Sequence, residues 1–430
     1  MLGLIIAYKL FPLIDSLLLL SRFSKLIFLN NHNEKHIMHY MMKIMLVGLR
    51  INGMDPTTQN CFFKILMFLN GTSVVTVFII NLLELLLNWH GVETFGDVHL
   101  ISSTSILAAK CIYISINQSK LLNLINTVGK FWKFDKFDVD TETRITGILD
   151  RAMAALKFFA SAVMGTAFSM LISGLLNREL IFPGYDICNL QSSPCYEINM
   201  VWQTYFCYFE LFPIVMGFDG LFVCFIGYAY CNLEMLKVAL KQMTLVIKKN
   251  HLPPNLRYET EEEKRLVKSN LTEIVEQHAQ VMQFIKEINK FYSPMMLVHS
   301  GSSLFSLIFC LYMITLDGIP PKFEVLAKYA SLLTTVCFQY LIFCYAGTII
   351  LEQSKSMEHH FYDLDWWYKT QPDFRHSVLL MIARAQAAPK LKIGNMDDLN
   401  LESYLAVLRN GVSAFTLMRT MSNSDKLNAL

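Results

Sequence analysis

Residues near position 360 have the side-chain types that could bind a metal ion. His359 and His360 are adjacent, and Asp363 and Asp365 follow closely. Successive residues of a helix point about 100° apart, so two neighbouring histidines do not converge on one ion. No other histidine or carboxylate residue stands at a spacing from these four that is typical of metal ligands. We therefore expect no metal centre.

The sequence also lacks the motifs of common enzymes. It contains no GxSxG, no HExxH, no glycine-rich phosphate loop and no pair of carboxylates on one helical face. We expect no enzymatic activity and no cofactor. The formal net charge is only +2, and no basic stripe with interleaved aromatic residues occurs. This charge pattern predicts no nucleic-acid partner.

The composition is typical of a protein that crosses a membrane several times. Of the 430 residues, 53% are hydrophobic and 17% are charged, whereas soluble domains have about 25% charged residues. Apolar stretches approach the roughly 20 residues that span a bilayer. We predict an all-α membrane protein with seven transmembrane helices, at 61–87, 98–117, 152–176, 199–231, 291–316, 325–350 and within 397–420.

The loop charges predict the orientation. Segments 118–157 and 233–290 carry seven and ten basic residues, whereas 88–99 carries none and 177–200 carries only Arg178. Basic loops remain in the cytoplasm. We therefore expect a cytoplasmic N-terminal segment at 1–60, whose first residues lie in the membrane interface. Segment 61–350 holds the first six helices, and after the seventh helix a tail at 421–430 lies outside the cell.

Two cysteines share the segment that this orientation places outside the cell. A disulfide between Cys188 and Cys195 is possible there, and the sequence leaves the question open. Most other cysteines fall inside predicted spans, where cysteine usually serves as a small buried residue.

The cytoplasmic segments show helical periodicity. Within 233–290, apolar residues Leu271, Ile274, Met282 and Ile285 form one stripe. This pattern predicts a long helix that begins in the cytoplasm and continues into the fifth span. The stripe has no lipid to face, so we expect the cytoplasmic helices at 233–290 and 351–396, with the last span, to carry the contacts between subunits. Segment 351–396 is expected to be helical too, with a short apolar helix at 377–387.

The last apolar stretch carries a recognisable motif. "ESYLAVLRNGVSAFTLMRT" resembles the C-terminal signature of insect odorant receptors. "HHFYDLDWWY" and "IARAQAAPKLKIG" resemble the segments that precede the last helix in that family. "SPCYEI" and "DLDWWY" are also similar to receptors of moths. The resemblance covers about residues 40–424, and its C-terminal motif comprises Tyr404, Arg409, Ser413, Phe415, Thr416 and Leu417.

The resemblance implies an odorant-gated, non-selective cation channel. Members of this family are multi-pass proteins of the plasma membrane of sensory neurons, and they form tetramers, usually with a shared co-receptor. The co-receptor has a long insertion in the region of 233–290 that this chain lacks, so the chain resembles a tuning subunit. Segments 233–290 and 351–396 would form a cytoplasmic anchor, and 397–420 would line the pore.

The family also implies a pocket for a small volatile ligand in the outer half of spans two to six. Depth and residue type favour particular side chains. The ligand candidates are Thr104, Leu107, Phe168, Ile172, Tyr205, Phe206, Phe209, Phe305, Phe309, Tyr329 and Leu333. In the last helix, Leu417, Thr420 and Met421 share one face and are the pore candidates.

Two alternatives stay open. Gustatory receptors usually carry a Gln-Phe pair in the last helix; this chain has Ala414-Phe415, which favours the odorant branch. A polytopic transporter would need buried ionisable residues, for which Lys110, Glu210 and Asp219 are the candidates. A transporter would usually also show an internal repeat, and none is visible in the sequence.

Overall fold

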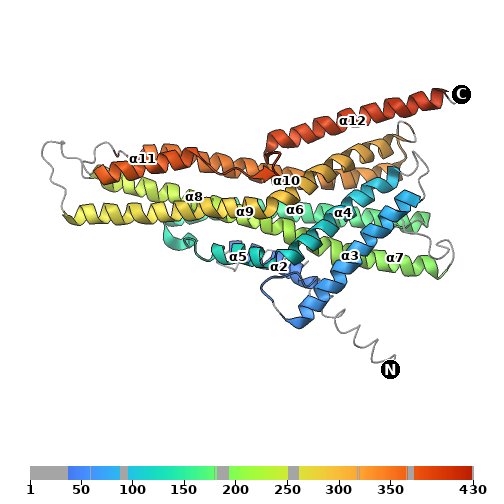
Figure 1. The fold of residues 1–430 in the computed structure, drawn as a ribbon, viewed down its shortest axis with the longest axis horizontal. Coiled ribbons are helices and arrows are strands. Elements are labelled where there is room, and N and C mark those ends of the chain that lie inside the picture. The colour runs from blue at the N-terminus through green and yellow to red at the C-terminus, as the bar shows by residue number, and fades with distance from the viewer. Residues whose placement is uncertain are drawn as a thin grey trace.

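The computed structural model describes residues 37–58, 60–87, 95–178, 180–181, 193–249, 261–316, 318, 320–364, 366 and 372–428. Long helices run side by side along the molecule, and the last helix diverges from them (Figure 1). All seven predicted spans are helical. They correspond to α3 (Cys61–Leu87), α4 (Phe95–Ile116), α6 (Val139–Asn177), α7–η3–α8 (Cys195–Lys249), α9 (Glu261–Leu316), α10 (Phe323–Tyr362) and α12 (Leu401–Asn428).

Five of the described helical segments are long and apolar enough to cross a membrane. They are α3, α6, α7–η3–α8, α9 and α10. In α4, the apolar part at Ile101–Ile116 is shorter. Helix α12 is not among the five, because polar residues are mixed with its apolar ones. It continues to Asn428, through most of the predicted tail.

Several helices extend far beyond the apolar stretches, at the end of the molecule where the basic segments gather. Here lie α5 (Gln118–Val128), the start of α6, the end of α8 and the start of α9, together with α11 (Pro372–Gln386). In Figure 1 the tips of α8, α9 and α11 lie together at the left. The predicted long helix through 271–285 is confirmed as α9, and the short helix predicted at 377–387 is α11.

The apolar stripe of α9 packs inside the chain. Leu271, Ile274 and Ile285 are buried, and Met282 packs against the same core. The stripe therefore cannot provide the expected contacts with other subunits, because α8 and α10 of the same chain pack on α9. That the cytoplasmic helices make such contacts through other faces stays a prediction. His278 is buried beside the ring of Phe361. Burial, aided by the nearby charge of Arg384, lowers the pKa of His278 to about 4.

Helix α8 (Phe212–Lys249) is the central helix of the bundle. It follows α7 (Cys195–Tyr205) through one π-helical segment, η3 (Phe206–Leu211). A π-turn interrupts the regular hydrogen bonds of a helix, and here the carbonyl of Phe209 accepts a bond from Asn52 Nδ2 at 3.1 Å. Asn52 Oδ1 in turn accepts from Asn70 Nδ2 at 3.0 Å. This chain of amides ties α3 to the π-turn.

Helix α2 (Ile37–Ile51) lies within the predicted N-terminal segment and packs along α8. Two glycines of α8 allow this close approach. A Cβ on Gly217 would lie 2.8 Å from carbon atoms of Leu49, and a Cβ on Gly220 would overlap the sulfur of Met45. The residues before α2 lie outside the described part, and so does the predicted interfacial segment.

A short hairpin positions the start of α12. Strands β1 (Lys392–Ile393) and β2 (Asp397–Asp398) pair antiparallel, and Gly394 between them has φ +59°. The hairpin is fixed to α9, because Ser293 Oγ donates to the carbonyl of Gly394 at 2.8 Å. Asn400 then caps α12 by accepting the amide of Ser403 at 2.8 Å.

Helix α10 and the start of α12 make a close backbone contact. A Cβ on Gly347 would overlap the carbonyl oxygen of Leu399. The amide of Leu401 donates to Thr348 Oγ1 at 3.0 Å in the same place. Since backbone cannot move aside as a flexible side chain can, this contact requires glycine at position 347.

We therefore predict that Gly347→Ala destabilises the protein by about 1–3 kcal/mol, the usual cost of overpacking. The matched control is Gly165→Ala in α6, where a Cβ meets nothing within 4 Å. The control should be neutral or slightly stabilising, because alanine favours helix over glycine. The measurement is the temperature at which detergent-solubilised protein loses its monodisperse gel-filtration peak. Equal midpoints for the two variants would contradict the prediction.

Candidate functional site

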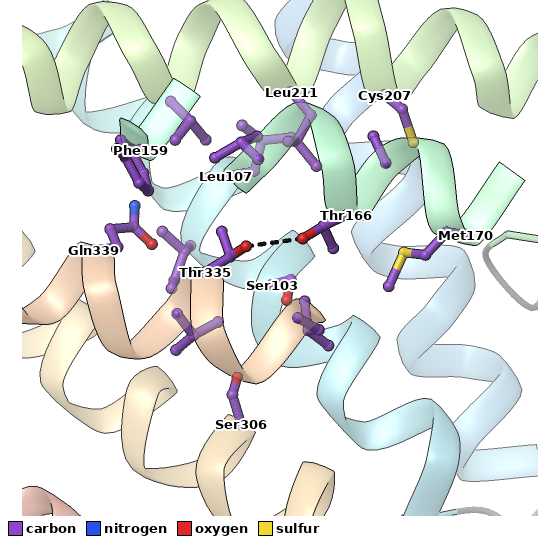
Figure 2. A pocket seen from close by; sticks show the side chains of 16 residues that line it. Ser103, Leu107, Phe159, Thr166, Met170, Cys207, Leu211, Ser306, Thr335 and Gln339 are labelled. Carbon is purple, nitrogen blue, oxygen red and sulfur yellow. Dashed lines mark hydrogen bonds between the residues drawn. The ribbon is translucent and has the colours of Figure 1, made fainter. Parts of the chain in front are cut away.

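A small cavity lies between α4, α6, η3–α8, α9 and α10 (Figure 2). Its volume is about 110 Å³. Most of its lining is apolar, as in sites that bind small lipophilic molecules. The apolar lining residues are Ile106, Leu107, Phe159, Val163, Ala167, Met170, Cys207, Leu211, Val215, Leu332 and Val336. The polar ones are Ser103, Thr166, Ser306, Thr335 and Gln339.

Helical periodicity explains why these residues meet. Helix α10 contributes Leu332, Thr335, Val336 and Gln339, at the spacing that places side chains on one face. Helices α4 and α6 contribute residues at the same kind of spacing. The cavity thus lies between helices that each direct one face toward it.

Two pairs of hydroxyl groups join α6 to α10 beside the cavity. Thr166 Oγ1 lies 2.8 Å from Thr335 Oγ1, and Ser169 Oγ lies 3.1 Å from Ser331 Oγ. Such bonds satisfy polar side chains between helices that have no access to water. They fix the distance between two walls of the cavity.

A buried ion pair lies directly behind the cavity. Lys110 Nζ of α4 is 2.7 Å from Oδ1 and 2.8 Å from Oδ2 of Asp219 in α8. The exposed fractions of the two side chains are 0% and 3%. Gln339 of the cavity wall donates its Nε2 to Asp219 Oδ2 at 2.6 Å, and His299 Nε2 lies 3.8 Å from Oδ1. One carboxylate therefore connects α4, α8, α9 and α10.

Lys110, Asp219 and Glu210 are the buried ionisable residues that a transporter would need. Lys110 and Asp219 neutralise each other, which is the usual arrangement for buried charges in a membrane. Glu210 of the π-turn is also buried, and one of its oxygens, Oε2, has no hydrogen-bond partner. It is separate from the Lys110–Asp219 pair, and none of the three residues lines the cavity.

The predicted ligand residues occupy several environments. Leu107 lines the cavity. Thr104, Phe206 and Tyr329 are buried outside its lining, and Leu333 is partly buried. Tyr205 and Phe209 stack on each other with ring centroids 5.1 Å apart.

The remaining candidates lie toward the outside of the bundle. Phe168, Ile172 and Phe305 are exposed, and Phe305 stacks with Phe309. None of these residues lines the cavity, and their roles in ligand binding stay predictions. In α6, sequence reasoning selected Phe168 and Ile172, whereas the cavity wall of this helix consists of Phe159, Val163, Thr166, Ala167 and Met170.

The predicted pore residues lie on an uncovered face of α12. Leu417 is 64% exposed and Met421 is 60% exposed, and Thr420 is exposed as well. Leu405 and Val412 are further exposed apolar residues of the same helix. The opposite face of α12 packs on α9, where Gly411 adjoins Leu307.

Of the two disulfide candidates, the structure describes Cys195. Cys195, at the start of α7, is disulfide-bonded. Cys188 lies outside the described residues. The described cysteines other than Cys195 are free.

A bundle of helices long and apolar enough to cross a membrane, with a small apolar cavity between them, defines a polytopic helical membrane protein. Residues 91–412 match the model of the family described as 7tm Odorant receptor. This match covers well over half of the chain. The protein therefore belongs to the 7tm odorant receptor family.

Individual relatives agree with this assignment. Odorant receptor Or2 of Anopheles gambiae is 25% identical over 56% of this chain, and odorant receptor 10 of Aedes albopictus is 20% identical over 82%. The chain spans 60% of the length of the Anopheles receptor and 92% of the Aedes receptor. It spans only 39% of odorant receptor 22c of Drosophila melanogaster.

A solved structure shows the same fold. The olfactory receptor OR5 of Machilis hrabei, determined in complex with eugenol, superposes with a TM-score of 0.70 at 13% identity. The match covers 90% of this chain and 100% of the other. The predicted all-α fold with seven transmembrane helices and the predicted family are thereby confirmed, and the family consists of receptors, not enzymes.

We predict that Lys110→Met strongly destabilises the protein. Removing one partner of a buried ion pair leaves the other charge without compensation, which costs roughly 3–5 kcal/mol. The double variant Lys110→Met/Asp219→Asn should recover most of this loss, because it carries no buried charge and the Asn carbonyl can still accept from Gln339. Thermal midpoints of the detergent-solubilised protein provide the measurement.

The control for this test is Lys390→Met, which breaks the exposed pair of Lys390 with Asp398. Exposed pairs contribute little, so this variant should match the wild type. A double variant as unstable as Lys110→Met alone would show that the loss arises from packing, not from an unpaired charge.

Proposed function

We propose that this protein is an odorant receptor subunit that binds a volatile, hydrophobic ligand in the cavity of Figure 2 and gates a non-selective cation channel. It acts as part of a tetramer, usually with the shared co-receptor of the family, in the plasma membrane. The observation that carries the proposal is the apolar cavity between α4, α6, α8, α9 and α10. Its largely apolar lining suits a small lipophilic molecule.

Helix α10 provides a route from the cavity to the channel. Thr335 and Gln339 line the cavity, and the next residue, Tyr340, has its ring 5.9 Å from that of Tyr404 in α12. Two turns further on, Gly347 touches the start of α12. A ligand that binds better to one position of α10 than to another therefore changes the position of α12.

Helix α12 is the pore helix in this proposal. Its exposed Leu417, Thr420 and Met421 face the conduction path, and Leu417 closes it in the resting state. A narrow ring of apolar side chains expels water and blocks ions. The remaining exposed apolar residues of α12 contact neighbouring subunits, while the apolar face of α3, with Phe62, Ile65 and Phe68, contacts lipid.

The proposed orientation follows from the loop charges. The end of the molecule that holds the basic segments, with α11, the start of α9 and the N-terminus, lies in the cytoplasm. The segments there form the anchor of the tetramer, using faces other than the α9 stripe. The C-terminal end of α12 then lies at the outer surface.

Filling the cavity should abolish the odorant response. We predict that Ala167→Phe lowers odorant-evoked current at least tenfold at equal surface expression, because the larger ring occupies the cavity. Ala154→Phe, on the exposed face of the same helix, is the matched control and should respond normally. The measurement is current in oocytes that express the chain with the co-receptor, across a panel of volatile compounds. Unchanged responses of Ala167→Phe would place the ligand elsewhere.

The pore assignment is tested with cysteines. In a Cys61→Ser background, which removes the free cysteine that is exposed among the described residues, Leu417→Cys and Thr420→Cys should change current when a charged, impermeant thiol reagent is applied from outside. Phe415→Cys, on the half-buried face of α12 that also carries Gly411, should not react. Reaction at position 415 with inert positions 417 and 420 would show that the opposite face of α12 lines the pore.

A further inference from the structure

The hydrogen-bonding capacity of the cavity wall is unevenly divided between donors and acceptors. Gln339 shows this most clearly. Its Nε2 lies 2.6 Å from Asp219 Oδ2, an oxygen that is also 2.8 Å from Lys110 Nζ. An ionised carboxylate only accepts hydrogen bonds, so the atom facing it must be the nitrogen of the Gln339 amide. The amide oxygen is therefore directed away from Asp219, on the side of the cavity that Gln339 lines.

The two threonines of the cavity retain no proton for a ligand. Thr335 Oγ1 lies 2.9 Å from the carbonyl of Ser331, to which it can donate. Thr166 Oγ1 lies 2.9 Å from the carbonyl of Ala162. The two hydroxyls are 2.8 Å from each other. Each hydroxyl has one proton, and these contacts use both, so only lone pairs remain.

The serines of the wall are occupied as well. Ser306 Oγ lies 3.3 Å from Ser102 Oγ, and Ser103 also has a partner. Gln339 and the two threonines therefore offer a bound molecule acceptor oxygens, and the second N–H of Gln339 is the one donor among these three side chains. A molecule with only acceptor atoms would leave the Gln339 oxygen in an apolar cavity without a donor, which is unfavourable.

We propose that this cavity selects volatile compounds with a hydroxyl group, alcohols or phenols, whose O–H donates to Gln339 Oε1. The hydroxyl oxygen can accept the remaining N–H of the same amide, while the hydrocarbon part lies against Phe159, Val163 and Leu107 (Figure 2). Ethers, acetate esters and aldehydes of the same carbon skeleton bring acceptors alone. This inference rests on the proposed function, because it specifies the ligand class of the same cavity.

The test uses matched pairs of compounds, each an alcohol or phenol together with its methyl ether, on oocytes that express the full chain with the co-receptor. The wild type should respond to the hydroxyl compound at concentrations on the order of tenfold lower than to its ether, as one unsatisfied polar group requires. Gln339→Met, which keeps the length of the side chain, should remove this difference by weakening only the hydroxyl compound. Asp219 keeps its bond to Lys110 in this variant.

Met170→Leu is the matched control, because it changes the cavity wall without a polar atom. It should shift both members of each pair alike. Equal potency of alcohols and ethers on the wild type, or a preference for esters or aldehydes, would overturn the inference and leave the proposed function intact. Absence of any evoked current at normal surface expression would instead overturn the proposed function. If Gln339→Met fails to reach the surface, the wild-type pairs alone decide, since a hydroxyl preference supports the inference and its absence refutes it.

Discussion

The arrangement of the bundle depends on one buried carboxylate. Asp219 accepts from Lys110 of α4 and from Gln339 of α10, and it lies near His299 of α9. In a medium without water, an ionised group must be paired and hydrogen-bonded within the protein. This requirement restricts how α4, α8, α9 and α10 can rotate about their axes. The same restriction determines which faces of α4 and α10 line the cavity, so the position of the proposed ligand site follows from the burial of this charge.

The contacts between helices are closest where side chains are smallest. Gly217 and Gly220 bring α2 against α8, and Gly347 brings α10 against the backbone before α12. Packing at such places is stiff, because backbone atoms cannot change rotamer. In the proposed mechanism, a small movement of α10 at the cavity is therefore transmitted to α12 through this contact. Helix α12 carries polar residues such as Arg409, Ser413 and Thr416, and it is not among the five clearly apolar spans. This composition fits a helix whose exposed face contacts protein or water as well as lipid.

Much of the fold could be predicted from the sequence. Apolar runs of sufficient length identified the spans, with the start of α3 at Cys61 and its end at Leu87 as predicted, and periodicity identified the long α9. The site was harder to predict. Of the residues selected by depth as ligand candidates, Leu107 lines the cavity, whereas Phe168 and Ile172 lie on the outer face of α6. The rotation of a transmembrane helix about its axis is fixed by its neighbours, and lipid-facing and core-facing positions are both apolar, so composition does not distinguish them.

The π-turn at Phe206–Leu211 has a consequence for how such receptors diverge. Cys207 and Leu211 of this turn both line the cavity. A π-turn contains one residue more than the helix needs, so losing or moving that residue along the chain would rotate α7 by about 100° relative to α8. The side chains that the turn itself presents to the cavity, Cys207 and Leu211, would be exchanged together, while the packing of α8 against α2 stayed as it is. Deleting one residue of this turn, or moving the extra residue along the chain, would thus change both of these cavity side chains at once. A point substitution changes only one.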